Sequence, residues 1–294
     1  MKEITVLSGK GGTGKTSITA ALASVAENTV FCDNDVDAAD LHLIFQPENN
    51  EVHTFFGGWK AYISADKCTG CNLCIEFCRF DSVFINKNSI PEINPVKCEG
   101  CRLCERICPS QAITSEQSSN NYWYVASTRF GPLVHARMGA GEENSGRLVT
   151  QIRKRAKEIA LERSSSYIIN DGPPGIGCAA ISSLSGTNLV LIVTEPTKSG
   201  LHDLQRLVDL IRSFGIKAYA IINKYNININ MTLEIEEYLS ANNIPVPARV
   251  PFDKQIVEAM IAGKTIIEYN PVSETAIIIK EIWKALKNHN DKLS

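Results

Sequence analysis

Eight of the ten cysteines fall into two runs with the same spacing. The runs are Cys68, Cys71, Cys74 and Cys78, then Cys98, Cys101, Cys104 and Cys108. Each reads C-x2-C-x2-C-x3-C, the ligand pattern of a pair of [4Fe–4S] clusters. Disulfide frameworks belong to small, loop-rich secreted chains, and zinc knuckles place a longer loop between two cysteine pairs. The spacing therefore favours iron–sulfur clusters, with zinc as the main alternative.

A second chemical motif lies near the start of the chain, where residues 9–16 read GKGGTGKT. This matches G-x-x-x-x-G-K-[ST], a phosphate-binding loop. Lys15 should reach the β- and γ-phosphates, and the Thr16 hydroxyl should bind Mg2+. The residues expected to contact the nucleotide here are Gly9, Gly11, Gly12, Thr13, Gly14, Lys15, Thr16 and Ser17. The sequence thus combines a redox module with a nucleotide site.

Composition narrows the class of protein. The chain has 294 residues and a formal net charge of −2, which gives no electrostatic reason to expect a nucleic-acid partner. No apolar run approaches the roughly 18 residues of a membrane span. The first eight residues lack the pattern of a secretory signal. We therefore expect a cytoplasmic protein that binds neither nucleic acid nor membrane.

The elements around these motifs alternate. Strands are expected at residues 3–8, 29–33, 188–194, 216–223 and 248–251, and helices at 15–27, 198–214, 231–241, 254–262 and 273–287. Strands that alternate with helices predict right-handed crossovers and a mostly parallel sheet covered on both faces. The expected fold class is α/β, a P-loop NTPase core.

The region from 60 to 113 differs in kind, because it is short, rich in cysteine and internally repeated. KCTGCNLCIEFC resembles KCEGCRLCERIC. Two copies are too few for a solenoid and predict a pseudo-twofold, ferredoxin-like α+β insert. The core would then comprise residues 1–59 and 114–294. A polar linker is expected at 115–121, followed by a return strand at 122–128.

One further residue identifies a family. Lys10 follows the first glycine, and the resulting KGGTGKT resembles the deviant Walker A motif of the MinD/ParA-type ATPases. The whole chain resembles the branch of that family with an inserted ferredoxin domain. The resemblance implies ATP and ADP as ligands, ATP hydrolysis and an ATP-dependent homodimer. Lys10 would cross the dimer interface and contact the nucleotide of the other subunit.

The same resemblance assigns further site residues. In CDNDVD, Asp35 aligns with the acid that positions attacking water, and Asp33 lies near Mg2+. In DGPPG, Asp171 would hold the metal through water. Asn223 would contact adenine, and Pro251 belongs to a weaker match for a second base-side loop. Acids at the carboxyl ends of strands also cap helices, which is the structural alternative.

In two-cluster ferredoxins the fourth cysteine of each run binds the other cluster. The expected ligand sets are Cys68, Cys71, Cys74 and Cys108 for one cluster, and Cys98, Cys101, Cys104 and Cys78 for the other. Cys32 is expected to be buried and inert. Cys178 follows the DGPPG segment, and by resemblance to the nitrogenase iron protein it is a speculative ligand of a third, bridging cluster in a dimer.

These motifs favour an ATPase whose nucleotide state gates two iron–sulfur clusters. The expected output is electron transfer to a redox or metalloprotein partner that the sequence does not name. One alternative is a spatial organiser or a maturation factor for a metalloprotein complex. Another is a carrier that donates its clusters, although four-cysteine sites of this type hold them firmly.

Overall fold

The computed structural model describes residues 1–139, 142 and 144–288. The chain divides into two compact units. Unit 1 comprises residues 1–52, 124–136 and 146–294, and unit 2 comprises residues 53–123 and 137–145. Unit 2 thus contains the cysteine-rich region 60–113 and extends beyond it on both sides.

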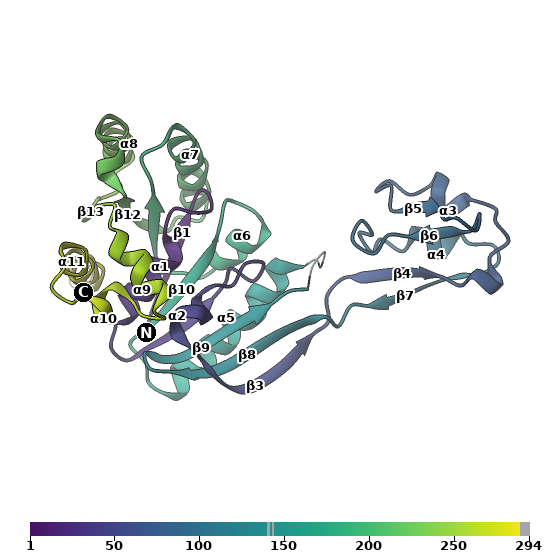
Figure 1. Cartoon of the computed structure of the whole chain (residues 1–294), viewed down its shortest axis with the longest axis horizontal. Coiled ribbons are helices and arrows are strands. Elements are labelled where there is room, and N and C mark those ends of the chain that lie inside the picture. Colours follow the sequence, from purple (N-terminus) through teal and green to yellow (C-terminus); the bar gives the residue numbers. More distant parts are fainter. Residues whose placement is uncertain (140–141, 143, 289–294) are drawn as a thin grey trace. The chain divides into compact units, whose positions relative to one another are not determined.

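A mostly parallel sheet forms the centre of unit 1 (Figure 1). Among the described residues its strand order is β13-β12-β11-β1-β10-β2-β9-β8-β3, and every pair from β13 to β9 is parallel. The strands are β1 (Lys2–Ser8), β2 (Thr29–Asp33), β3 (Glu48–Phe55), β8 (Asn121–Thr128), β9 (Gly131–Arg137), β10 (Tyr167–Pro174), β11 (Leu189–Thr194), β12 (Lys217–Asn223) and β13 (Ala248–Val250). The expected parallel α/β core is confirmed.

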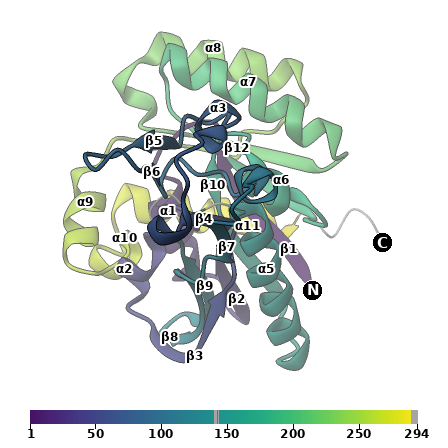
Figure 2. The same cartoon turned by 90° about the vertical axis from the view of Figure 1, so that its right-hand side faces the viewer.

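Helices cover both faces of this sheet, as the end-on view in Figure 2 shows. The helices of unit 1 are α1 (Lys15–Ala23), α2 (Leu41–Phe45), α5 (Ser145–Glu162), α6 (Cys178–Leu184), α7 (Lys198–Ser213), α8 (Ile229–Ala241), α9 (Lys254–Ile261), α10 (Ile266–Tyr269) and α11 (Glu274–Asn288). Side chains of α1, α2, α10 and α11 share one buried apolar cluster with the sheet. Those of α6, α7 and α8 share another. The carboxyl ends of the parallel strands are left for the connecting loops, where ligands bind in such folds.

Unit 2 is built from two antiparallel strand pairs and two short helices. Its elements are β4 (Trp59–Ile63), the 3-10 turn η1 (Ala65–Lys67), α3 (Leu73–Glu76), β5 (Val83–Ile85), β6 (Pro91–Ile93), α4 (Leu103–Ile107) and β7 (Ile113–Gln117). Strand β4 pairs with β7, and β5 pairs with β6. The expectation of a linker at 115–121 is wrong in its first half, because Ser115 lies opposite Ala61 in the β4–β7 ladder.

Equivalent positions in the two cysteine runs of unit 2 lie 30 residues apart and share their backbone conformation. Left-handed φ angles recur in pairs: 69° and 61° at Gly70 and Gly100, 62° and 60° at Asn72 and Arg102, 48° and 50° at Asp81 and Gln111. Non-glycine residues seldom adopt this conformation. Its repetition at a fixed offset means that both runs fold in the same way, as the repeated sequence predicts.

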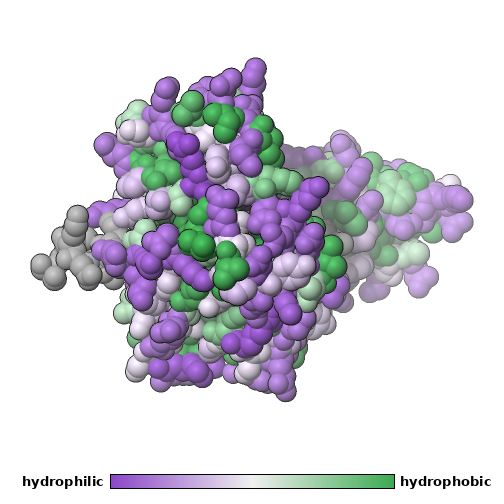
Figure 3. Space-filling model, turned by 60° about the vertical axis from the view of Figure 1, so that its left-hand side comes forward, coloured by the Kyte–Doolittle hydropathy of each residue, from purple (hydrophilic) through white to green (hydrophobic). Residues whose placement is uncertain are grey.

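The surface is mainly polar on the face shown in Figure 3, where hydrophobic side chains lie in small separate groups. Across the part of the chain that the structure describes, every helix is too short or too polar to pass through a lipid bilayer.

Candidate nucleotide site and cysteine pocket

The loop between β1 and α1 has the backbone of a phosphate cradle. Gly12 and Gly14 adopt positive φ angles of 78° and 89°, which favour glycine. A Cβ atom on Gly14 would also lie 2.4 Å from Nδ2 of Asn223. Helix α1 begins directly after Gly14, so its amino end and the preceding N–H groups create positive potential at the loop.

Lys15 lies at the centre of a buried polar cluster. Its Nζ atom is 3.0 Å from Oδ1 of Asp171, at the end of β10. The hydroxyl of Thr16 donates to Oδ2 of Asp171 at 2.7 Å, and the hydroxyl of Thr19 donates to Oδ1 at 2.9 Å. Burial opposes a charged lysine, but Asp171, Asp35 and Asp33 outweigh it and raise the pKa of Lys15. The sequence motif and the DGPPG acid therefore meet in one place.

Two further carboxylates complete this cluster. Asp35 lies 3.7 Å from Nζ of Lys15, and burial together with Asp171 raises the pKa of Asp35 to about 6 against the opposing effect of Lys15. Asp33 is fully buried and accepts hydrogen bonds from the backbone N–H groups of Asp35 and Leu41. Burial and the neighbouring Asp171 raise the pKa of Asp33 well above its usual range. The three acids predicted to converge on the loop do so.

The donor atoms in this cluster suit a hard divalent cation. Thr16, Asp33 and Asp171 offer only hydroxyl and carboxylate oxygens, which Mg2+ prefers. The buried hydroxyl of Thr13 in the same loop has no hydrogen-bond partner. A buried polar atom without a partner costs free energy, so a ligand that reached it would remove that cost.

Lys10 is held within its own chain. Its Nζ atom lies 2.7 Å from Oε1 of Glu195 and donates to the hydroxyls of Thr197 and Ser199, each at 3.0 Å. Glu195 follows β11 and also lies 3.1 Å from Nζ of Lys224. The expected role of Lys10 across a dimer interface stays a prediction, because these contacts are those of a single chain.

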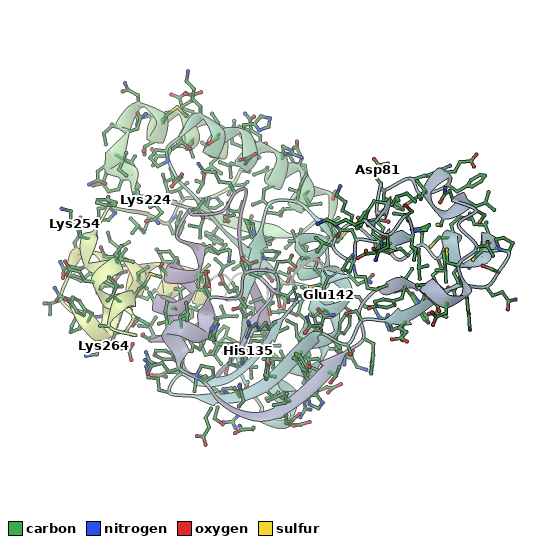
Figure 4. The ribbon with its side chains drawn as sticks, turned by 45° about the vertical axis from the view of Figure 1, so that its right-hand side comes forward. Asp81, His135, Glu142, Lys224, Lys254 and Lys264 are labelled. Atoms are coloured by element: carbon green, nitrogen blue, oxygen red, sulfur yellow. The ribbon has the colours of Figure 1, made fainter. Side chains whose placement is uncertain are left out.

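Asn223, one of the two residues predicted to face the base, lies beside the loop. Nδ2 of Asn223 donates to the carbonyl oxygen of Thr13 at 2.7 Å, and Nζ of Lys224 donates to that of Gly12 at 3.0 Å. Lys224 directly follows β12 and is labelled in Figure 4. Pro251 follows β13 and is half-buried. In this structure Asn223 braces the loop, and its contact with adenine stays a prediction.

The cysteines of both runs lie in unit 2, where Figure 4 draws their sulfur atoms in yellow. All ten cysteines of the chain are free thiols. Four of them, Cys68, Cys71, Cys74 and Cys108, line one small apolar cavity together with residues such as Ile63 and Ile113. This is the first ligand set expected from the sequence. It includes Cys108, the fourth cysteine of the other run, and the binding of a cluster by this set stays a prediction.

Three cysteines of the second expected ligand set, Cys98, Cys101 and Cys104, lie close enough to interact electrostatically, and the place of Cys78 in this set stays a prediction. Burial raises the pKa of Cys104 to about 11, and the nearby thiols of Cys98, Cys101 and Cys74 add to this effect. Thiolates bind iron, so positive charge from metal would be needed to deprotonate such a group. Free soft thiols in an apolar pocket fit an iron–sulfur cluster chemically. Within the described residues, however, no three His, Cys, Asp or Glu side chains already have the arrangement of a single-ion metal site.

The two remaining cysteines differ from each other. Cys32 in β2 is fully buried, and burial raises its pKa well above the usual range, in keeping with an inert thiol. Cys178 is exposed at the first position of α6. Its proposed part in a bridging cluster stays a hypothesis.

Sequence reasoning missed two residues near these sites. Glu195 comes directly after the apolar strand β11, and an acid at the end of such a strand is the signal that could have found it. Lys60 of β4 is buried, and its Nζ donates to the carbonyl oxygen of Cys98 at 3.0 Å. No motif in the sequence pointed to Lys60, because its contact depends on strand β4 packing against a loop 38 residues away.

Known proteins resemble the chain along most of its length. The protein MJ0578 of Methanocaldococcus jannaschii, which is uncharacterized, is 33% identical over 290 residues, covering 97% of this chain and 96% of the relative. The septum site-determining protein MinD of Synechocystis is 23% identical over 295 residues, covering 98% and 90%. The structure of MinD from Pyrococcus horikoshii, complexed with Mg-ADP, covers 100% of this chain and 99% of its own, with a TM-score of 0.60 and 18% identity.

The sequence-family model of the CobQ/CobB/MinD/ParA nucleotide binding domain matches residues 4–266. This range includes the loop at 9–16, the carboxylates of Asp33, Asp35 and Asp171, and Asn223. This match covers most of the chain. It agrees with the family that the KGGTGKT motif indicates and with the fold of unit 1. The chain therefore belongs to the CobQ/CobB/MinD/ParA family of P-loop nucleotide-binding proteins.

Proposed function

We propose that the protein is a Mg2+-dependent ATPase whose nucleotide state is coupled to two [4Fe–4S] clusters held in unit 2. The observation that most supports ATP binding and hydrolysis is the buried polar cluster in which Lys15 and Thr16 both contact Asp171. The cysteine pocket, lined by the four thiols of one expected ligand set, supports the cluster half.

The nucleotide site would act through positioning and charge. The backbone N–H groups of residues 9–16 and Nζ of Lys15 bind the β- and γ-phosphates, so Lys15 exchanges carboxylate partners for phosphate oxygens. Thr16, Asp33 and Asp171 would hold Mg2+, which neutralises phosphate charge when bound. Asp35 orients the attacking water. The Mg-ADP complex of the P. horikoshii relative supports this choice of ligand.

Dimerisation would complete the nucleotide site. Lys10 leaves Glu195 and contacts the nucleotide of a second copy of the chain, in the way a trans-acting arginine stabilises charge in other NTPases. The two hydroxyls that Lys10 now contacts, those of Thr197 and Ser199, belong to the loop and first turn of α7. Release of Lys10 would therefore free this segment as well, which offers one route from the nucleotide to the rest of the chain.

In unit 2, Cys68, Cys71, Cys74 and Cys108 would hold one cluster, and Cys98, Cys101, Cys104 and Cys78 the other. Each cluster supplies one-electron storage when bound. We propose that the output is electron transfer to a redox or metalloprotein partner. The MinD relatives, whose names describe septum-site determination, support a second candidate, an organiser that positions or matures such a partner.

Gated electron transfer and the organiser function can be distinguished by measuring the midpoint potentials of the clusters with ADP and with a non-hydrolysable ATP analogue. Coupling requires that the two cluster oxidation states prefer different nucleotide states. A shift of about 59 mV or more, equal to about 1.4 kcal/mol for one electron, supports gated electron transfer. Unchanged potentials together with ATP-dependent recruitment of a partner support the organiser.

A further inference from the structure

The two cysteine loops of unit 2 have the same backbone conformation but different surroundings. A Cβ atom on Gly100 would lie 2.3 Å from the carbonyl oxygen of Trp59, because β4 packs directly on the loop between Cys98 and Cys101. The equivalent Gly70, in the loop between Cys68 and Cys71, has no atom within 4 Å of such a Cβ. The Trp59 end of β4 therefore packs on the second loop at Gly100, and no equivalent contact is made at Gly70.

This packing brings one buried cation to the second loop. Lys60 is 6% exposed, and its Nζ donates to the carbonyl oxygen of Cys98 at 3.0 Å. The pseudo-symmetric position, 30 residues further along, is Ile90, which has no charge. The sequence repeat therefore has a lysine at this position in one half and an isoleucine in the other.

Two other positively charged side chains lie at the second loop. The guanidinium of Arg102 stacks over the ring of Trp59, with its Cζ 4.3 Å from the ring centroid, and pairs with Glu105 through two hydrogen bonds. Lys97, the residue before Cys98, is exposed to solvent. A charge in water loses most of its effect over a few ångströms, whereas a buried charge keeps it. Glu116 lies opposite Lys60 in the β4–β7 ladder and belongs to the same local charge balance.

We propose that Lys60 tunes the reduction potential of the cluster bound by Cys98, Cys101, Cys104 and Cys78, and so makes the two clusters electronically unequal. Positive charge and hydrogen bonding near a cluster stabilise its reduced form, which carries one more electron. Lys60 acts through its charge and through the Cys98 carbonyl, and it is a positioning residue rather than a ligand. This inference rests on the proposed function, since it concerns a cluster in unit 2.

The test uses the full chain, reconstituted anaerobically with iron and sulfide, and a redox titration followed by electron paramagnetic resonance. Cys101→Ser identifies the signal of the second cluster. Lys60→Met should shift the reduction equilibrium of that cluster about tenfold toward the oxidised form, or 59 mV for one electron. Lys60→Arg keeps the charge and should restore the wild-type value. Lys97→Met removes an exposed charge from the residue next to Cys98 in sequence and should leave the potential unchanged.

If Lys60→Met does not retain the cluster, Lys60→Gln preserves a hydrogen-bond donor without the charge, and the same shift is expected. An unchanged potential in Lys60→Met, or an equal shift in Lys97→Met, overturns the inference. Loss of the cluster in both neutral variants but not in Lys60→Arg also overturns it, because the role is then structural. Wild-type protein that binds no cluster refutes the proposed function itself, which is a separate outcome.

Discussion

The carboxylate of Glu195 lies 2.7 Å from the amino group of Lys10, the signature lysine of the phosphate loop. Hydrogen bonds to Lys10 and Lys224 offset the burial of this carboxylate and lower the pKa of Glu195. Both partners are partly exposed, with 25% of the Lys10 side chain and 16% of Glu195 accessible. Glu195 therefore forms an ion pair with Lys10 inside one chain, whereas we propose that Lys10 contacts the nucleotide of the other subunit in the dimer.

We predict that Glu195→Gln strengthens ATP-dependent dimerisation. The substitution removes a competing, partly exposed ion pair worth about 0.5–1 kcal/mol in each of the two subunits, so the dimer dissociation constant should fall about five- to thirtyfold. Sedimentation with a non-hydrolysable ATP analogue measures it. Lys10→Ala is the matched control and should abolish the dimer while the monomer still binds ATP. A dimer that forms equally well in Lys10→Ala would contradict the proposed role of Lys10.

Asp35→Asn should separate ATP binding from hydrolysis. Asp35 contacts Lys15 at 3.7 Å but lies outside the tighter set formed by Lys15, Thr16 and Asp171. We expect turnover to fall about 100-fold or more, the usual scale for losing a positioned acid or base, with ATP affinity retained within about threefold. Phosphate release and fluorescent-nucleotide binding measure the two quantities. Retained turnover would remove Asp35 from the mechanism.

Gly100→Ala should disturb the second cysteine loop more than Gly70→Ala disturbs the first. Both glycines have left-handed φ angles, so each substitution costs about 1 kcal/mol of backbone strain. Only at Gly100 does the added methyl group meet backbone, the Trp59 carbonyl. Iron content after anaerobic reconstitution should fall toward half in Gly100→Ala and stay near wild type in Gly70→Ala. Equal losses would mean that the packing of β4 is unimportant.

His135 should make folding stability sensitive to mild acid. Its ring, in β9 (Figure 4), stacks on Tyr124 with 4.9 Å between centroids and lies 3.1 Å from Oδ1 of Asn49. Burial, with a smaller effect of His42, lowers the pKa of His135 to about 4. The unfolded chain, with a value of about 6.5, therefore takes up the proton first, and stability falls as pH drops from about 6.5 toward 4.

The corresponding measurement is urea unfolding at pH 7 and at pH 5 for the wild type and His135→Gln. The wild type should lose about 2 kcal/mol more than the variant between these values. His202→Gln serves as the control, because this exposed ring is hydrated in both the folded and the unfolded chain. Identical pH dependence in the wild type and His135→Gln would mean that the ring is protonated without cost in the folded protein.

The parallel core could be predicted because its strands are continuous apolar runs. Strands β2 and β11 differ from the predicted ranges by at most one residue, and α7 begins at the predicted Lys198. Helix α5 was missed although its buried Leu148 and Ile152 have helical spacing, because the many charged residues after Ile152 obscured the pattern. The packing of that helix, through an ion pair of Arg153 with the buried Glu3, joins residues 150 positions apart.

The candidate sites show the same difference between local sequence patterns and contacts that join distant segments. The loop at 9–16 and the cysteine runs are local patterns, so their residues could be named from the sequence. The position of Glu195 beside Lys10 depends on β1 and β11 pairing in the sheet. Strand β7, which pairs with β4, contains Ser115 and Gln117, and these polar residues carry no strand signal of their own. The contact of Lys60 could be found only from the structure, because it depends on β4 packing against the loop that contains Cys98.

The central claim, that one chain binds ATP and two [4Fe–4S] clusters, is tested most directly by metal and sulfide analysis of anaerobically reconstituted protein that has been shown to bind Mg2+-ATP. We predict about eight iron atoms and about eight sulfides per chain, with about half of each lost in Cys71→Ser and in Cys101→Ser. A chain that takes up zinc without sulfide, or no metal at all, while still binding ATP would contradict the account.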